Sequence, residues 1–549
     1  MRTLPLAVLM GMAAGAAVAA AAEAPAPMPA LAPADAKALV EVRNAAALRE
    51  SLLGGRFWAL LEGTQAAIAR RSTDQYRQAE ERLEKLLARL GMTRREAMRA
   101  YFGGASALVV LPGAGERPPG VLLTETTKDL AVRLVEASGG AEAGRHRDVT
   151  LWEVRGEERT SRLAYAGGVL LATESEGDAL EHVLDTVVGG GASLQADGRF
   201  AAATAGLPPD WRVRAYAADT KPHGGPGAAT FYPWDEGRVR AEWQMLVPAD
   251  APLGAALAAA NEPVRLTGPA ILPAGAVAAV ATALHPPAIW DLAKAKAAAE
   301  ENGPTRLRRA EMMIRAWFPG ESLEAILGAF GPEAAMALVP PEGGAAKEGA
   351  AAGAPPALVA MVRIRQGGDG AALAFKKGLE AKALLLAALA DDTQPRLDVR
   401  NESYGDVSLL IIEAPEALTN NVLGDLGRGS ALTVAIHEGW LIAGTAPGAV
   451  KAVLAAASGR GAGGLAAALA DSGAAPPAGP VTRWGAVRPV GGADLILRVA
   501  EQLAGREKLE EADRLVNLAE LMDLVKQGAW QRTDGPGAIR GSADLQVIH

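Results

Sequence analysis

The order of sequence signals along this chain of 549 residues occurs twice, and this constrains the fold more than any single element does. Phe102 and Pro112 have counterparts in Phe330 and Pro340, at a constant offset of 330 − 102 = 228 residues. Each pair encloses an apolar run that is typical of a strand. Because a repeated order requires the same supersecondary unit to form twice, the sequence predicts two domains of one architecture in tandem.

A second stretch of the chain also occurs twice. Residues 163–189 read as a strand, a glycine turn, another strand and a helix rich in Ala, Leu and Val. Residues 432–459 have the same order, with Gly439 in the place of Gly168. Both stretches therefore predict a hairpin that leads into a packed helix.

Each copy is expected to close with an antiparallel strand. Apolar and polar residues alternate over 239–247, and the same alternation recurs over 539–547, at an offset of 539 − 239 = 300. This period of two is typical of a strand with one buried face and one solvent-exposed face. The apolar positions, which include Trp243, are therefore predicted to be buried in both copies.

We therefore expect an α+β protein that is a tandem duplication of a domain with a mainly antiparallel sheet and packed helices. Residues 35–262 are predicted to form the first repeat, with a helix from Ser72 to Gly91, and residues 263–549 the second. A charged helix at about residues 507–527 is expected as an insertion in the second repeat. Its apolar stripe predicts core packing, with a partner-binding helix as the alternative.

The first 22 residues have the composition of a secretory signal peptide. Arg2 is followed by an apolar segment over 4–18 and by small residues at the expected cleavage site after Ala22. Cleavage there predicts a periplasmic or extracellular protein, with a membrane-anchored form as the alternative. The apolar segment is shorter than the ~20 residues of a spanning helix, so no stable transmembrane segment is expected after processing. Residues 23–34, rich in Ala and Pro, are predicted to be a flexible leader.

The local motifs of catalysis and cofactor binding are missing, so we predict no catalytic, cofactor-binding or metal-binding residue and no cofactor. The chain has no cysteine, which excludes disulfides, thiolate metal sites and cysteine nucleophiles. Its six histidines are scattered, without the paired helical spacing of a zinc site. Residues 104–108 lack the last glycine of a serine-hydrolase motif, and the glycine-rich run at 459–464 follows a helix rather than a strand.

Two classes of function remain. The favoured one is a non-catalytic binding or scaffolding module of the bacterial envelope, whose unknown partner is an envelope protein, a lipid or a glycan. The alternative is a hydrolase with a dispersed carboxylate or serine site at the repeat interface. Asp197, His437 and Glu438 are the polar residues that would belong to a site present in one copy alone. Nucleic acid is excluded as a partner, because the net charge is −8 and the short basic runs are flanked by carboxylates or apolar residues.

One further stretch carries a resemblance. Residues 193–200 have the pattern Ser-Leu-x-x-Asp-x-x-Phe, with Ser193 and Asp197 at its polar positions, after a hairpin, a helix and a glycine run. In these features the chain resembles a family of bacterial exported or membrane-anchored proteins that is catalogued only as a domain of unknown function. The second copy has Gly464 in this segment, so no role carries over to both halves. The resemblance implies a fold and an envelope location, and no activity.

Overall fold

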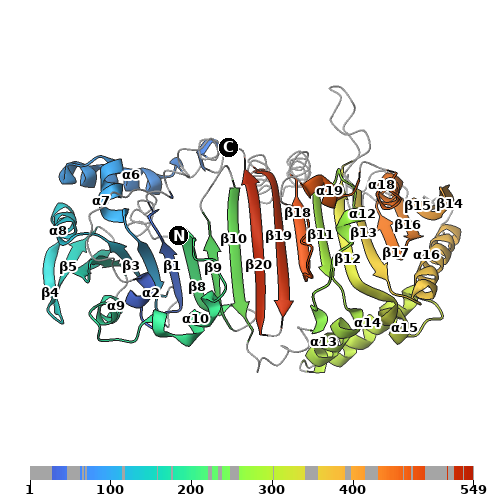
Figure 1. Ribbon diagram of the computed structural model, residues 1–549, viewed down its shortest axis with the longest axis horizontal. Helices are drawn as coiled ribbons and strands as arrows, with labels where there is room; N and C mark the ends of the chain where they lie inside the picture. The colour runs from blue at the N-terminus through green and yellow to red at the C-terminus, as the bar shows by residue number, and fades with distance from the viewer. Residues whose placement is uncertain are drawn as a thin grey trace. The chain divides into compact units, whose positions relative to one another are not determined.

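The computed structural model describes the residues that form the helices and strands named below. The described ranges are 27–45, 48, 62–64, 67–68, 71–113, 118–156, 159–174, 177–220, 225–232, 238–247, 259–298, 300, 302–340, 357–389, 397–413, 431–460, 463–470, 474–488, 516, 525–535 and 537–547. The chain forms two compact units, residues 1–248 with 546–549 and residues 249–545, so the last four residues, expected in the second repeat, group with the first unit. Each unit is described by itself. Both consist of an antiparallel sheet with helices on its faces, so the expected α+β class is confirmed (Figure 1).

The sheet of the first unit is antiparallel throughout its described pairings. Its strands are β1 (Ala38–Val42), β2 (Ser106–Val110), β3 (Gly120–Glu125), β4 (Ala141–His146), β5 (Val149–Arg155), β6 (Thr160–Ala166), β7 (Val169–Thr173), β8 (Val213–Thr220), β9 (Gly225–Phe231) and β10 (Arg238–Leu246). They lie in the order β4-β5-β6-β7-β3-β2-β1-β8-β9-β10.

Helices cover both faces of this sheet. They are α2 (Met28–Leu31), α6 (Asp74–Leu90), α7 (Arg94–Phe102), α8 (Lys128–Ala137), α9 (Ala179–Val187), the 3-10 turn η1 (Leu194–Ala196) and α10 (Gly198–Thr204). Side chains of α2, α9, η1 and α10 share one core cluster with Leu39, Val109 and Leu123 of the sheet. Side chains of α6, α7 and α8 pack on the opposite face, around Leu122 and Leu170.

The second unit has the same plan. Its strands are β11 (Ala278–Ala283), β12 (Phe330–Val339), β13 (Ala357–Ile364), β14 (Asp398–Tyr404), β15 (Val407–Glu413), β16 (Ala431–His437), β17 (Trp440–Gly444), β18 (Arg483–Val487), β19 (Val525–Gly535) and β20 (Ala538–Val547). They lie in the order β14-β15-β16-β17-β13-β12-β11-β18-β19-β20. This order is that of the first unit with ten added to each strand number.

The helices of the second unit occur between equivalent strands. They are α12 (Gly268–Ile271), α13 (Pro286–Ala298), α14 (Gly303–Trp317), α15 (Leu323–Ala329), α16 (Asp369–Leu389), α18 (Pro447–Ala457) and α19 (Leu465–Ala470). Side chains of α12, α18 and α19 pack on one face of the sheet with Val359, Ile411 and Ile442. On the other face, α15 and α16 pack against Leu410 and Val434.

The register of the strands also agrees between the units. Ala38 of β1 pairs with Ala217 of β8, and Ala278 of β11 pairs with Val487 of β18, each as the first of five paired positions. Pro33 forms an isolated bridge at the entry to β1, and Pro273 forms one at the entry to β11. The equivalence therefore extends to single backbone positions.

The start of the first repeat differs from the expectation. Residues 28–31, expected in a flexible leader, form α2, because Met28 and Leu31 lie on one side of this short helix and are buried in the core. The helix expected from Ser72 is capped by Thr73, whose hydroxyl accepts from the Tyr76 N–H, and it ends as predicted at Gly91.

Residues 249–262, expected in the first repeat, group with the second unit. The carbonyl of Asn261 accepts from Thr482, and that of Glu262 lies 2.9 Å from the His285 ring. The helix expected to reach about Gln527 was wrong at its end, because residues 525–527 belong to β19, and the rest of its range lies outside the described residues apart from Val516.

The alternation expected for the closing strands was also wrong in part. In β10 the buried residue is Gln244, which was assigned to the wet face, whereas Trp243 is half-buried. The cause is α10, whose Ala202 carbonyl accepts a 2.9 Å hydrogen bond from the Gln244 amide. In β20 Ile539 is buried as expected, but Leu545 is exposed.

Candidate functional site

The first candidate is a buried ion pair in the first unit. Glu41 of β1 is only 3% exposed, and its carboxylate accepts a 2.6 Å hydrogen bond from the guanidinium of Arg214 on β8. That guanidinium lies 4.5 Å from the ring centroid of Trp211 and 5.2 Å from that of Phe200. Burial raises the pKa of the Glu41 carboxyl, and the charge of Arg214 opposes the rise. The carboxylate of Glu41 is paired within the core, whereas the buried Nε of Arg214 has no hydrogen-bond partner among the described residues.

The second unit buries a different carboxylate at the start of its first helix. Glu333 of β12 is also 3% exposed, and it accepts hydrogen bonds from the N–H and the hydroxyl of Thr267 and from the Gly268 N–H. Burial raises the pKa of Glu333, whereas these hydrogen bonds lower it. Because its acceptor positions are occupied by the backbone at the start of α12, Glu333 serves to hold this helix on the sheet.

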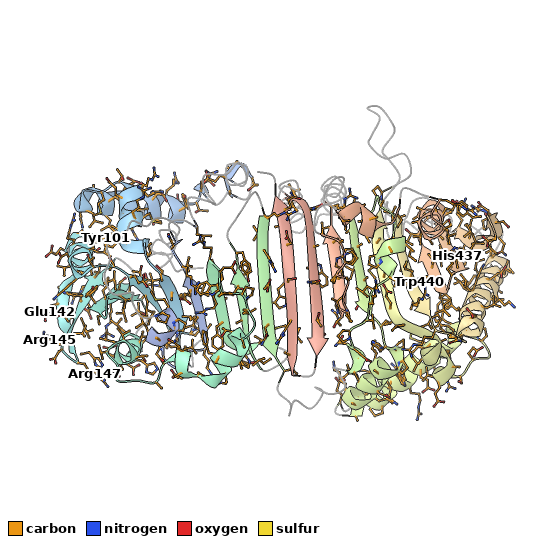
Figure 2. All side chains as sticks on the ribbon, viewed as in Figure 1. Tyr101, Glu142, Arg145, Arg147, His437 and Trp440 are labelled. Atoms are coloured by element: carbon orange, nitrogen blue, oxygen red, sulfur yellow. The ribbon has the colours of Figure 1, made fainter. Side chains whose placement is uncertain are left out.

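Three side chains lie in one row across strands β13, β17 and β16 of the second unit. Arg363 of β13 and His437 of β16 flank Trp440 of β17, and Figure 2 shows His437 and Trp440 on these neighbouring strands. The Arg363 guanidinium lies 5.2 Å from the Trp440 ring centroid and donates to the Glu438 carbonyl at 3.1 Å. The His437 Nε2 lies 3.8 Å from the Glu438 carboxylate, too far for a hydrogen bond. This row fixes the β16–β17 turn, where Glu438 and Gly439 both have positive φ.

The residues that carry the family resemblance have packing roles. Ser193 forms a bridge with Pro33, and Leu194 is fully buried. Asp197 caps α10 by accepting from the Arg199 N–H at 2.7 Å, and Phe200 packs edge-on against Tyr216. In the second unit, Gly464 and Leu465 take the places of Ser193 and Leu194. The motif therefore specifies how the helix that follows it is seated, and Asp197 and His437 lie in different units.

A half-exposed charged cluster lies at the β4–β5 hairpin of the first unit. Asp185 of α9 contacts the His146 ring and the Arg147 guanidinium, each at 2.7 Å. The hydrogen bond from His146 and the charge of Arg147 lower the pKa of Asp185. Figure 2 shows Arg145 and Arg147 at this end of the unit. These contacts tie the hairpin to α9.

Six exposed large apolar side chains of the second unit lie on α14 and α16, and we call them the α14–α16 surface. Their exposed fractions are 58% for Met312, 67% for Met313, 41% for Trp317, 58% for Leu385, 61% for Leu386 and 72% for Leu389. The two helices meet where the Lys382 ammonium lies 4.0 Å from the centroid of the Trp317 ring. Exposed groups of large apolar side chains of this kind mark interaction sites.

This surface was not predicted from the sequence. Its only signals are the run of leucines at 384–386 and the two methionines that follow Arg308 and Arg309. Such runs are equally typical of a buried helix. Only the packing of Ile314 on the inner side of α14, and of Phe318 directly after the helix, against the core shows that the methionines face outward.

Several residues singled out from the sequence lie outside the described residues. They are the proposed signal peptide, Glu157, Glu158, His223, Trp234, Asp391, Asp392 and His549. Over the part of the chain that is described, no three acidic or histidine side chains gather closely enough to hold a metal ion. Within the same residues, no helix is both long and apolar enough to cross a bilayer.

No protein-family model matches the chain, and no curated protein matches it in sequence. Among solved structures, the chain is similar to crystal form I of TP0453, a Treponema protein, with a TM-score of 0.24 and 10% sequence identity. The match covers 41% of this chain and 81% of that chain.

Proposed function

We propose that the chain is an exported envelope protein built from two copies of one α+β domain, and that it acts as a binding or scaffolding module without catalysis of its own. The common strand order and register of the two units support the duplication. Export rests on the composition of residues 1–22.

The α14–α16 surface carries the binding function. A helix at the surface of a domain normally turns its large apolar side chains toward the core and leaves polar ones outside. In α14 the outward side includes Met312, Met313 and Trp317, and α13 beside it has no buried residue. Exposed apolar area of this kind is stabilised by a partner that removes it from water.

The buried carboxylates support a role without catalysis. A general acid or base needs a proton-accepting position that faces a reacting group. Glu41 is held by Arg214, and Glu333 is held by the backbone of residues 267 and 268. Both carboxylates therefore maintain the fold.

The experiment is a substrate screen of the chain from Glu23, purified and tested with generic esterase, peptidase, phosphatase and glycosidase substrates. We expect no turnover that copurifies with the protein. Turnover that disappears on exchange of one partly buried polar residue, such as His437→Gln, would overturn the proposal. Leu180→Val, a conservative core change in the other unit, is the control for lost activity through lost stability.

A further inference from the structure

We propose that the α14–α16 surface binds the surface of a lipid bilayer that contains anionic headgroups. This inference rests on the proposed binding function and names its partner. It is carried by the positions of the apolar and basic side chains on α14, by the contact between α14 and α16, and by the local charge.

The outward side of α14 consists of two parallel rows. Arg308 and Met312 form one row, and Arg309, Met313 and Trp317 form the other, since residues four apart lie above one another on a helix. All five side chains are exposed. Each row thus begins with a guanidinium and continues with apolar groups, and the second row ends in a tryptophan.

The apolar rows continue onto α16. The ring of Trp317 touches Lys382, which also donates to the Ala316 carbonyl. Leu385, Leu386 and Leu389 follow Lys382 by three, four and seven residues, which places them on the same side of α16. Their exposed fractions of 58 to 72% show that these leucines face away from the core, in which Ala383 of the same helix is buried.

The charge of this surface is opposite to that of the chain. Between Gly303 and Trp317 there are four arginines and one glutamate, in a protein with net charge −8. Arg306 and Arg315 pair with Glu300 and Glu311. In the described part of the chain, Arg308 and Arg309 have no ion-pair partner. Two guanidiniums are therefore available to bind an anion that arrives with the partner.

A bilayer surface with anionic lipids fits this pattern. Methionine and leucine side chains enter the acyl region, tryptophan prefers the headgroup level, and arginine extends to the phosphates. Side chains that project singly, as Leu389 does with 72% exposed, enter a fluid acyl layer without a preformed pocket. A protein partner has to supply a matching pocket for each of them.

The test uses the chain from Glu23, which keeps every described residue and lacks the apolar first 22 residues that would bind lipid by themselves. It is sedimented with vesicles of phosphatidylglycerol and phosphatidylcholine, and with vesicles of phosphatidylcholine alone. We expect at least tenfold stronger partitioning to the anionic vesicles at low salt, and a loss of this preference at high salt.

The variant Met313→Gln with Leu389→Gln should partition more than tenfold less, since a tenfold change corresponds to about 1.4 kcal/mol and two apolar side chains lose their burial. Leu373→Gln is the matched control, because Leu373 is 44% exposed on another side of α16, and it should change partitioning less than twofold. The variant Arg308→Gln with Arg309→Gln should reduce the preference for anionic vesicles about tenfold. Arg145→Gln, an exposed arginine of the other unit, should not.

Equal binding to both vesicle types, or unchanged binding by the Met313 and Leu389 variant, would overturn the inference. A third outcome would also overturn it: the protein does not bind vesicles, and analytical ultracentrifugation shows a dimer that this variant dissociates. The surface would then bind a second copy of the chain. Circular dichroism confirms that each variant is folded. Failure of the proposed function itself appears separately, as turnover in the substrate screen.

Discussion

Removal of the cation from the buried pair in the first unit is the most direct perturbation of this fold. In Arg214→Leu, the carboxyl of Glu41, only 3% exposed, is left without its guanidinium. Loss of one partner of such a pair costs about 3–5 kcal/mol when the remaining group stays charged. The Glu41 carboxylate can instead become protonated, because burial already raises its pKa. The protonated group then carries no charge.

Protonation sets the size of the effect. Starting from the ordinary value of 4.5, protonating this carboxyl costs about 3.4 kcal/mol at pH 7 and about 0.7 kcal/mol at pH 5, at about 1.36 kcal/mol per pH unit. The wild-type protein already bears part of this cost through its raised pKa. We therefore expect Arg214→Leu to destabilise the first unit by about 2–3 kcal/mol at pH 7 and by less than about 1 kcal/mol at pH 5.

The second unit supplies the control. Glu41 and Arg214 are the fourth of the five pairs between β1 and β8, and the fourth pair between β11 and β18 is Ala281 with Trp484. The double variant Glu41→Ala with Arg214→Trp copies that apolar pair and removes both charges, so its stability should not depend on this titration.

The assay is hydrogen exchange of β1 and β8 peptides, read by mass spectrometry at both pH values after correction for intrinsic rates. A loss in Arg214→Leu that is equal at pH 5 and pH 7 refutes the reasoning, as does a loss below about 0.5 kcal/mol at pH 7.

Three further predictions follow from single contacts. The folded-state pKa of Glu333 is raised, so protonation of this carboxyl favours the folded state. The free energy of unfolding of the wild type, relative to that of Glu333→Gln, should therefore increase as the pH falls from the folded-state pKa toward 4.5. Urea unfolding across this range measures the difference, and a difference that does not change with pH contradicts the prediction. Asp197→Ala removes the cap of α10 and should cost about 1 kcal/mol in the first unit, with no change in exchange at α19. A Cβ at Gly464 would lie 1.6 Å from the Ala270 carbonyl oxygen, so Gly464→Ala should lower the melting temperature by several degrees, whereas Gly275→Ala, which has open space, should not.

The elements of the fold were largely predictable from local sequence. The strand, glycine turn, strand and helix expected over 163–189 are β6, the turn at Gly168, β7 and α9, because each element has strong apolar periodicity and the glycine turn separates the strands. The ends were less predictable. Met28 is buried because the sheet and α9 close over it, and nothing in an Ala- and Pro-rich segment signals this tertiary contact.

The faces of the edge strands and the candidate sites depended on the same kind of contact. Gln244 is buried because α10 supplies a carbonyl at that point, against the period-two pattern of its own strand. The α14–α16 surface was out of reach for a related reason. Whether Met313 faces the core or the solvent is decided by which side of α14 carries Ile314 and Phe318, and a basic, apolar helix permits both arrangements.

Two similar sets of strands in one chain can pair wrongly during folding. The different residues at equivalent positions, Glu41 with Arg214 and Ala281 with Trp484, disfavour such pairing. Strands of matching length and register in one chain are prone to exchange partners, so that β18 would pair with β1, or β8 with β11. The first exchange would bury Glu41 beside Trp484 without the guanidinium of Arg214, and the second would bury Arg214 beside Ala281 without an anion. Both leave an uncompensated charge in a core, whereas the native pairings leave none. We therefore expect the ion pair to favour the pairing of β8 with β1 over its pairing with β11.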